Sequence, residues 1–497
     1  MTTARQLVDK LWSYCDVLRD DGVGVIEYTE QLTYLLFLKM AHERATRPLK
    51  PQRIIPEEYS WNHLMAATGD DLEREYTRIL NGLAKEDGVI GTVFRKAQNR
   101  VNDPAKLRRL IVDLIGKEKW SATGTDINGD AYEGLLAKGA SDKGSGAGQY
   151  FTPRPLIQAI VDVIDPTVND RVVDPACGTG GFLLVAHEHA STGVDEMTPN
   201  QRHNLQYDFA HGVELVDGTA RLASMNLLLH GMGSFNSDAL IDVRDSLTAD
   251  PGERWSVVLS NPPFGRKSSM TMIGEDGRES KDGQTIERQD FVATTSNKQL
   301  NFVQHIMTIL ETNGRAAVVL PDNVLFEGGA GETIRRKLLT DYDLHTMLRL
   351  PTGIFYAQGV KANVLFFDKK MARPGKPWTE KLWVYDLRTN KHFTLKQNPL
   401  NRSDLDEFVD GYKRGSFDER VESERWKAFT YDEIVARDKA NLDITWLRDA
   451  SLEDLDALPS PDVIAREIVE DLTAALAEFE TVASALEGQL ASAPTDE

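Results

Sequence analysis

The chain has 497 residues, and a 41% hydrophobic content is enough to form sizeable cores, which excludes a disordered protein. There are 57 Lys and Arg against 77 Asp and Glu, giving a net charge of −20. A protein that held DNA mainly by its own phosphate contacts would usually be basic, so here it would need a local basic patch or a basic partner. Only two cysteines, Cys15 and Cys177, are present, which excludes a disulfide scaffold or a Cys-rich zinc module and favours a reducing cytoplasm.

No membrane segment or signal peptide is predicted. The first residues lack a basic stretch followed by an apolar one, and no apolar run approaches the ~20 residues of a membrane span. We therefore expect a soluble, cytoplasmic protein without a membrane partner.

Residues 1–140 predict an all-α N-terminal domain. Leu7, Leu11 and Leu18 recur at helical spacing, and further apolar helices are expected at 28–42 and 107–115. No charged constellation typical of a site occurs there, so we interpret this part as a helical packing domain. Glycine and small residues at 141–148 predict a linker.

Residues 149–370 predict an α/β domain, because short apolar strands alternate with helices. That alternation is typical of a mainly parallel sheet with helices on both faces, which binds ligands at the carboxyl ends of its strands. The expected strands are 171–173, 209–215, 255–259, 315–320, 343–350 and 364–367. The expected helices are 182–190, 218–230 and 301–311.

Three further segments complete the chain. Residues 266–298 are rich in glycine and polar residues and predict a long loop, either a disordered insertion or a substrate-gating loop. Residues 371–455 combine a strand at 381–387 with short helices, as a C-terminal part of the catalytic region. Within 456–497, a helix from residue 461 to about 491 has apolar residues at coiled-coil spacing, and it either docks onto a partner or lies on its own domain.

The strongest chemical signal is a glycine-rich turn between the strand ending at Val173 and the next helix. It reads Asp174-Pro175-Ala176-Cys177-Gly178-Thr179-Gly180-Gly181-Phe182. The glycines allow a sharp turn and close approach to a ligand, and the new helix offers free N–H groups. No Gly-Lys-Ser/Thr sequence follows, which argues against a phosphate loop, and an acid at the strand end suits a cationic or amine-bearing ligand.

Glu214 ends the next predicted strand. There, a carboxylate can accept hydrogen bonds from both hydroxyls of a ribose, although a lone Glu at this place is more often a helix cap.

A third strand, 255–259, leads directly into Asn261-Pro262-Pro263-Phe264. The Asn261 side-chain carbonyl and the Pro262 carbonyl are two fixed acceptors, and Phe264 is a stacking ring. This set suits a planar group bearing NH2: accepting both N–H hydrogens favours a nucleophilic, pyramidal nitrogen as charge develops.

These motifs together resemble an S-adenosylmethionine-dependent amino-methyltransferase, and more specifically the modification (methyltransferase) subunit of type I restriction–modification systems, which methylates adenine N6 in DNA. The resemblance covers nearly the whole chain. Its further matches are Leu35-Leu36-Phe37-Leu38-Lys39-Met40, Val319-Leu320-Pro321-Asp322-Asn323-Val324-Leu325-Phe326, Val364-Leu365-Phe366-Phe367-Asp368-Lys369 and Asn441-Leu442-Asp443-Ile444. One departure is Ala362, where the family pattern leads us to expect threonine.

The resemblance implies a Rossmann-like S-adenosylmethionine-dependent methyltransferase core with an all-α N-terminal domain and a C-terminal helical extension. It implies that Asn261, Pro262, Pro263 and Phe264 are catalytic, and that S-adenosylmethionine is the cofactor. The cofactor-binding residues that it implies are Gln149, Tyr150, Phe151, Thr152, Pro153, Asp174, Ala176, Gly178, Thr179, Gly180, Gly181, Glu214 and Asp245. No metal ligands are expected. Cytosine-carbon methylation would need a cysteine nucleophile, which Cys15 and Cys177 are not placed to supply.

The implied partners are double-stranded DNA, a specificity subunit that reads the sequence, a second copy of this subunit, and a restriction subunit in the full complex. The helix within 456–497 is our candidate for docking onto the specificity subunit. Two alternatives stay open at this point: a protein-glutamine N-methyltransferase, since that amide is also planar, and a non-catalytic scaffold of a DNA-processing complex.

Overall fold

The structure is a computed structural model. It describes residues 4–19, 22–47, 51–120, 127–141, 152–264, 269–273, 279–283, 285–355, 360–395 and 397–447. Gln149, Tyr150, Phe151, most of the expected linker and the expected helix within 456–497 lie outside these residues. Met1–Thr445 form one unit by their contacts, and Trp446–Glu497 form a second unit of which only residues 446 and 447 are described.

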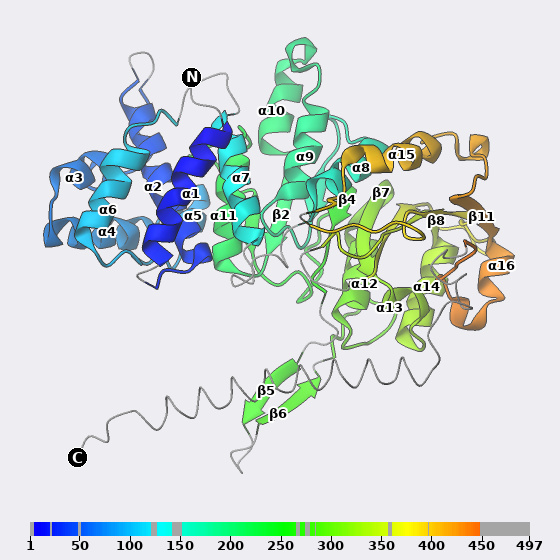
Figure 1. The fold of residues 1–497 in the computed structure, drawn as a ribbon. Coiled ribbons are helices and arrows are strands. Elements are labelled where there is room, and N and C mark those ends of the chain that lie inside the picture. The colour runs from blue at the N-terminus through cyan, green and yellow to red at the C-terminus, as the bar shows by residue number, and fades with distance from the viewer. Residues whose placement is uncertain are drawn as a thin grey trace, which may run out of the picture. The chain divides into compact units, whose positions relative to one another are not determined.

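The N-terminal part is helical, as the apolar spacing predicts (Figure 1). Its helices are α1 (Ala4–Arg19), α2 (Val25–Ala45), α3 (Trp61–Ala66), α4 (Asp70–Leu83), α5 (Gly88–Phe94), α6 (Pro104–Arg109), a π-helical turn (Leu110–Ile115) and α7 (Ile127–Ser141). Apolar side chains occur around the whole circumference of α2, and a helix of that kind must be buried. Tyr28, Leu32 and Leu36 of α2 are all fully buried in the core of this part.

A nine-stranded sheet forms the remainder of the core, in the order β11-β10-β8-β9-β7-β4-β1-β2-β3 (Figure 1). Its strands are β1 (Val172–Asp174), β2 (Ala210–Glu214), β3 (Ile241–Val243), β4 (Trp255–Ser260), β7 (Leu310–Pro321), β8 (Tyr342–Arg349), β9 (Ala362–Lys369), β10 (Lys381–Asp386) and β11 (Trp426–Thr430). The pairs β1–β2, β2–β3, β1–β4, β4–β7 and β8–β10 are parallel, while β9 lies antiparallel between β7 and β8. This mixed sheet confirms the expected α/β, Rossmann-like class.

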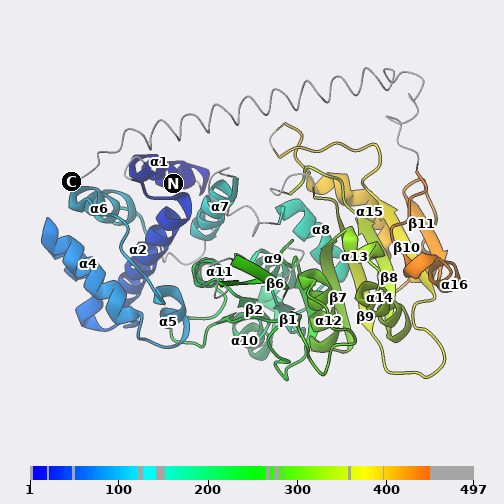
Figure 2. The same cartoon turned by 90° about the horizontal axis from the view of Figure 1, so that it is seen from below.

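Helices cover both faces of this sheet, with α8 and α15 on one side and α12 and α14 on the other (Figure 2). These helices are α8 (Arg154–Ile164), α9 (Gly181–Ala190), α10 (Pro199–Tyr207), α11 (Asp217–Leu229), α12 (Lys298–Ile309), α13 (Asn323–Phe326), α14 (Ala330–Asp341), α15 (Asp406–Tyr412) and α16 (Tyr431–Val435). The expected helix at 301–311 is wrong at its end, because β7 already begins at Leu310. No described helix combines the length and apolar character needed to cross a membrane.

The segment 266–298 is not a uniform loop, which corrects the sequence-based expectation. It contains an antiparallel ribbon of β5 (Ser269–Ile273) and β6 (Glu279–Gly283). Its last part is tied to α12: the Gln304 side chain accepts from the Ala293 N–H and donates to the Ala293 carbonyl, both at 2.9 Å. A polar side chain of α12 makes these hydrogen bonds, so the polar, glycine-rich composition of residues 266–298 could not predict them.

Candidate active site

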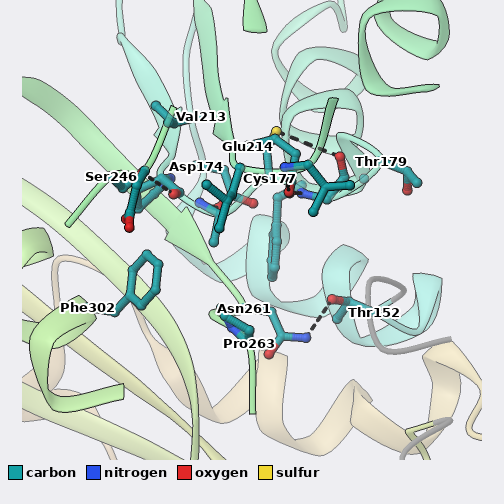
Figure 3. A pocket seen from close by; sticks show the side chains of 18 of the residues that line it. Thr152, Asp174, Cys177, Thr179, Val213, Glu214, Ser246, Asn261, Pro263 and Phe302 are labelled. Carbon is teal, nitrogen blue, oxygen red and sulfur yellow. Dashed lines mark hydrogen bonds between the residues drawn. The ribbon is translucent and has the colours of Figure 1, made fainter. Parts of the chain in front are cut away.

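A pocket opens at the carboxyl ends of β1, β2 and β4, where the sequence predicts the site (Figure 3). The predicted residues that line it are Thr152, Asp174, Ala176, Gly178, Thr179, Gly181, Glu214, Asp245, Asn261 and Pro263. Three loops that are distant in the sequence therefore meet at one cavity.

Asp174 is the last residue of β1 and is almost fully buried beneath the glycine-rich turn. Its Oδ1 accepts a hydrogen bond from the Ser260 hydroxyl at 2.7 Å and from the Ala176 N–H at 3.0 Å. Burial is the dominant cause that raises the pKa of Asp174 to about 7, and the two hydrogen bonds oppose it. This carboxyl group can therefore change its charge near neutral pH.

The turn above Asp174 uses glycine where the backbone requires it. Gly178 has a φ of +55° and Gly180 a φ of +83°, both in the left-handed region that favours glycine. Gly180 also packs where an added Cβ would meet the Leu227 side chain at 3.4 Å. The turn is thereby held close to α11.

Glu214 ends β2 and connects the turn to the start of α11. Its Oε2 accepts from the Gly178 N–H at 3.1 Å, and its Oε1 accepts from the Val216 N–H at 2.9 Å. Burial raises the pKa of Glu214, and these backbone hydrogen bonds oppose the increase. A carboxylate has about four acceptor positions, and the Leu215 backbone also contributes a hydrogen bond, so Glu214 retains some acceptor capacity for a ligand in the pocket.

Asn261 follows β4 and faces the pocket from the opposite side to Asp174 and Glu214 (Figure 3). Its Nδ2 donates to the Thr152 hydroxyl at 2.9 Å. Its Oδ1 is buried and has no hydrogen-bond partner among the described residues. A buried, unpaired acceptor is costly, so this oxygen is suited to a donor supplied by a bound molecule.

Among the predicted site residues that the structure describes, four do not line the pocket: Pro153, Gly180, Pro262 and Phe264. Pro262 is buried and Phe264 is half-buried. The Phe264 ring contacts the Phe355 ring edge-to-face, with centroids 5.5 Å apart. Asp245 does line the pocket, and its Oδ1 accepts from the Leu247 N–H at 2.9 Å.

The sequence analysis missed several lining residues. Leu215 and Val216 are 61% and 42% exposed, although both are large apolar residues, and they directly follow Glu214. Phe302 of α12 adds an aromatic wall, and no local motif marks it. Glu133 of α7, in the part that the sequence analysis interpreted as a helical packing domain, also lines the pocket.

Comparisons with known proteins show the family to which the chain belongs. Residues 123–452 match the N-6 DNA Methylase family, and residues 7–114 match the HsdM N-terminal domain. The methylase subunit of type I restriction enzyme EcoKI from Escherichia coli (strain K12) is 38% identical over 518 residues, which cover 96% of this chain and 94% of that protein.

Two solved structures are similar over nearly the whole chain. The crystal structure of the EcoKI M protein has a TM-score of 0.54 and 34% identity, and the match covers 97% of this chain and 96% of that one. A chain from a study of complex assembly and conformational transition of the type I R-M system has a TM-score of 0.72 and 28% identity, with coverages of 98% and 99%. The chain thus belongs to the N-6 DNA methylase family as a methylase (modification) subunit of the type I restriction enzyme kind, and it is a DNA adenine methyltransferase.

Proposed function

We propose that this pocket binds S-adenosylmethionine, that an everted adenine lies beside the cofactor against the Asn261 loop, and that the chain methylates adenine N6 in double-stranded DNA to protect host DNA from a partner endonuclease. The unpaired Asn261 Oδ1 is the observation that carries the proposal. It lies in the same cavity as the two buried acids of β1 and β2.

The pocket residues fit S-adenosylmethionine. Glu214 has acceptor positions left for a ribose diol, and Asp174 offers a carboxylate to the positively charged methionine portion. Leu215, Val216 and Phe302 supply apolar walls for a flat ring. When bound, this cofactor supplies a methyl group that is attached to a positively charged sulfonium sulfur. Once the methyl group has been transferred, the rest of the cofactor is a neutral thioether, which is a good leaving group.

The Asn261 loop would hold the target amine. The Asn261 Oδ1 and the Pro262 carbonyl accept the two N6 hydrogens, which favours a pyramidal, nucleophilic nitrogen in the transition state. Thr152 accepts from the Asn261 Nδ2 and so fixes which way the amide faces. Phe264 stacks on the everted base, which offsets part of the few kcal/mol needed to unstack it from the duplex.

We further propose that a specificity subunit reads the DNA sequence, that two copies of this chain attach to it, and that a restriction subunit joins the full complex in the cytoplasm. The net charge of −20 supports this assignment, because a strongly acidic chain benefits from a partner that supplies the DNA contacts. The chain from the type I R-M assembly study, which matches over nearly its whole length, supports it as well. No described feature favours the protein-glutamine or scaffold alternatives.

A tritium-transfer assay on the complex with the specificity subunit tests the proposal, with DNA and protein offered as separate acceptors. We expect Asn261→Ala to lower kcat by about 10²–10³-fold, the usual effect of removing one transition-state hydrogen bond, while S-adenosylmethionine still binds. Asn401→Ala, at a helix end remote in sequence from the pocket residues, is the matched control and should methylate normally. Label transferred to protein instead of DNA would overturn the substrate assignment.

A further inference from the structure

Helix α11 belongs to two hydrophobic cores at once. Leu222, Met225 and Leu228 are buried with the N-terminal helices, whereas Ala223 and Leu227 are buried with the sheet. Helix α11 contacts the N-terminal helices α2, α5 and α7, and it also contacts β2, β3 and α9 of the catalytic core. The N-terminal helices and the catalytic core therefore share this element.

The same helix supports the candidate cofactor pocket at two points. Leu215 and Val216 line the pocket and immediately precede Asp217, the first residue of α11. Within the last turn of α11, Asn226 also lines the pocket and donates to the Thr179 carbonyl of the glycine-rich turn at 3.1 Å. A shift of α11 would therefore move Leu215 and Val216 at its start together with Asn226 near its end.

Arg221 fastens α11 to the N-terminal helices, and only 3% of this residue is exposed. Its guanidinium donates to the Val93 and Arg95 carbonyls at 2.6 Å each and forms an ion pair with Glu30 of α2. It also lies over the Tyr34 ring, 4.9 Å from the centroid. A cation at the carboxyl end of α5 is favourable in itself, because it satisfies the last carbonyls of that helix.

Glu30, the acidic partner of Arg221, is in a buried position that disfavours its charged form. Burial is the main cause that raises the pKa of Glu30, and Arg221 is the strongest opposing influence. A second ion pair, between Lys96 and Asp217 at 2.6 Å, links the same two parts at the start of α11. All the described partners of the Arg221 guanidinium are in the N-terminal helices, although Arg221 itself belongs to the catalytic fold.

We propose that Arg221 is a positioning residue for cofactor binding, which couples the N-terminal helices to the pocket through α11. It acts by holding Leu215, Val216 and Asn226 where they contact the cofactor. This inference rests on the proposed cofactor site. Coupling of this kind is reciprocal, so cofactor binding must also stabilise the N-terminal helices.

The experiment compares Arg221→Met with Arg315→Met in the full-length chain. Arg315 is a suitable control because it is also largely buried, pairs with Asp170 and donates to the Ile164 carbonyl, but it does not line the pocket. Calorimetry should show that Arg221→Met raises the Kd for S-adenosylmethionine about tenfold, within the usual range of coupling, while kcat at saturating cofactor changes less than about twofold. Arg315→Met should lower the melting temperature and leave that Kd unchanged.

Two further variants keep the test decisive. Arg221→Lys should restore only part of the affinity, because an ammonium keeps the charge but not the fork of donors. If Arg221→Met fails to fold, Glu30→Gln removes the ion pair more gently and should still raise the Kd severalfold. An unchanged Kd in either folded variant overturns the inference.

Hydrogen exchange supplies a readout that a purely structural role would not change. In the wild type, saturating S-adenosylmethionine should slow exchange in α2 and α5; in Arg221→Met at saturation, that protection should be lost. Equal protection in both proteins would refute the coupling. Failure of the wild type to bind the cofactor would instead refute the proposed function.

Discussion

Replacing Asp174 with Asn tests the electrostatics of the pocket most sharply. The amide keeps the shape of the side chain and an oxygen that can accept from Ser260 and Ala176, but it cannot ionise. The stability of the cofactor-free protein and its affinity for the cofactor should then change in opposite directions.

The magnitude follows from the pKa. Burial raises the pKa of Asp174 from 3.8 to about 7, a shift of roughly three units, and each unit corresponds to about 1.4 kcal/mol. Because the folded-state pKa is the higher one, the folded protein binds more protons than the unfolded chain between pH ~4 and ~7. Stability therefore falls as the pH rises through this window, and above pH ~7 the ionised carboxylate costs about 4 kcal/mol.

Calorimetric melting of wild type and Asp174→Asn at pH values from 4 to 8 measures this difference. We expect the variant to gain stability relative to the wild type as the pH rises, up to about 4 kcal/mol, with no further gain above pH ~7. Glu214 is present in both proteins, and its charge also raises the pKa of Asp174, so the difference reports Asp174 together with its coupling to Glu214. For the positively charged cofactor, wild-type affinity should rise through pH 7 while that of the variant stays low and flat. A stability difference independent of pH would refute the reasoning.

Two other predictions follow from the same geometry, and a third follows from the apolar spacing within residues 456–497. Glu214→Gln places an NH2 group against the Gly178 or Val216 N–H, so we expect the Kd for S-adenosylmethionine to rise about 10–100-fold; an unchanged Kd would count against the ribose assignment. Phe264→Ala removes a stacking contact of about 1–3 kcal/mol and should weaken base eversion, seen as reduced 2-aminopurine fluorescence with cofactor affinity intact; equal fluorescence would exclude the stacking role. Truncation after Asp456 should weaken capture of the specificity subunit and leave cofactor binding unchanged; equal capture by both chains would contradict the docking role.

Local motifs made much of the catalytic fold predictable. The strands that begin or end at Val172, Glu214 and Trp255 carry their own apolar runs, and the chemistry directly follows them. Strands β3 and β11 were not predicted, because the short β3 has an acid, Asp242, between its two apolar residues and β11 follows a polar, irregular stretch. The antiparallel placement of β9 between β7 and β8 depends on pairing between strands, which apolar patterning does not encode.

Residues of the candidate site could be predicted only where a single loop contains both the backbone turn and the functional side chain. Asp174, Glu214 and Asn261 meet that condition, and all three line the pocket. Phe302 and Glu133 do not, because each reaches the pocket through the packing of a whole helix. The sharing of α11 between two cores was hidden for the same reason, since a helix buried on most sides shows no clear apolar stripe.

A crystal structure of the assembled enzyme with DNA and a non-reactive cofactor analogue tests the central claim most directly. The measured quantity is the distance between the position of the donor methyl group and N6 of the everted adenine. We predict a near-attack separation of about 3–3.5 Å, with the Asn261 Oδ1 accepting from N6. A separation above ~10 Å in every closed form, far outside that range, would contradict the account.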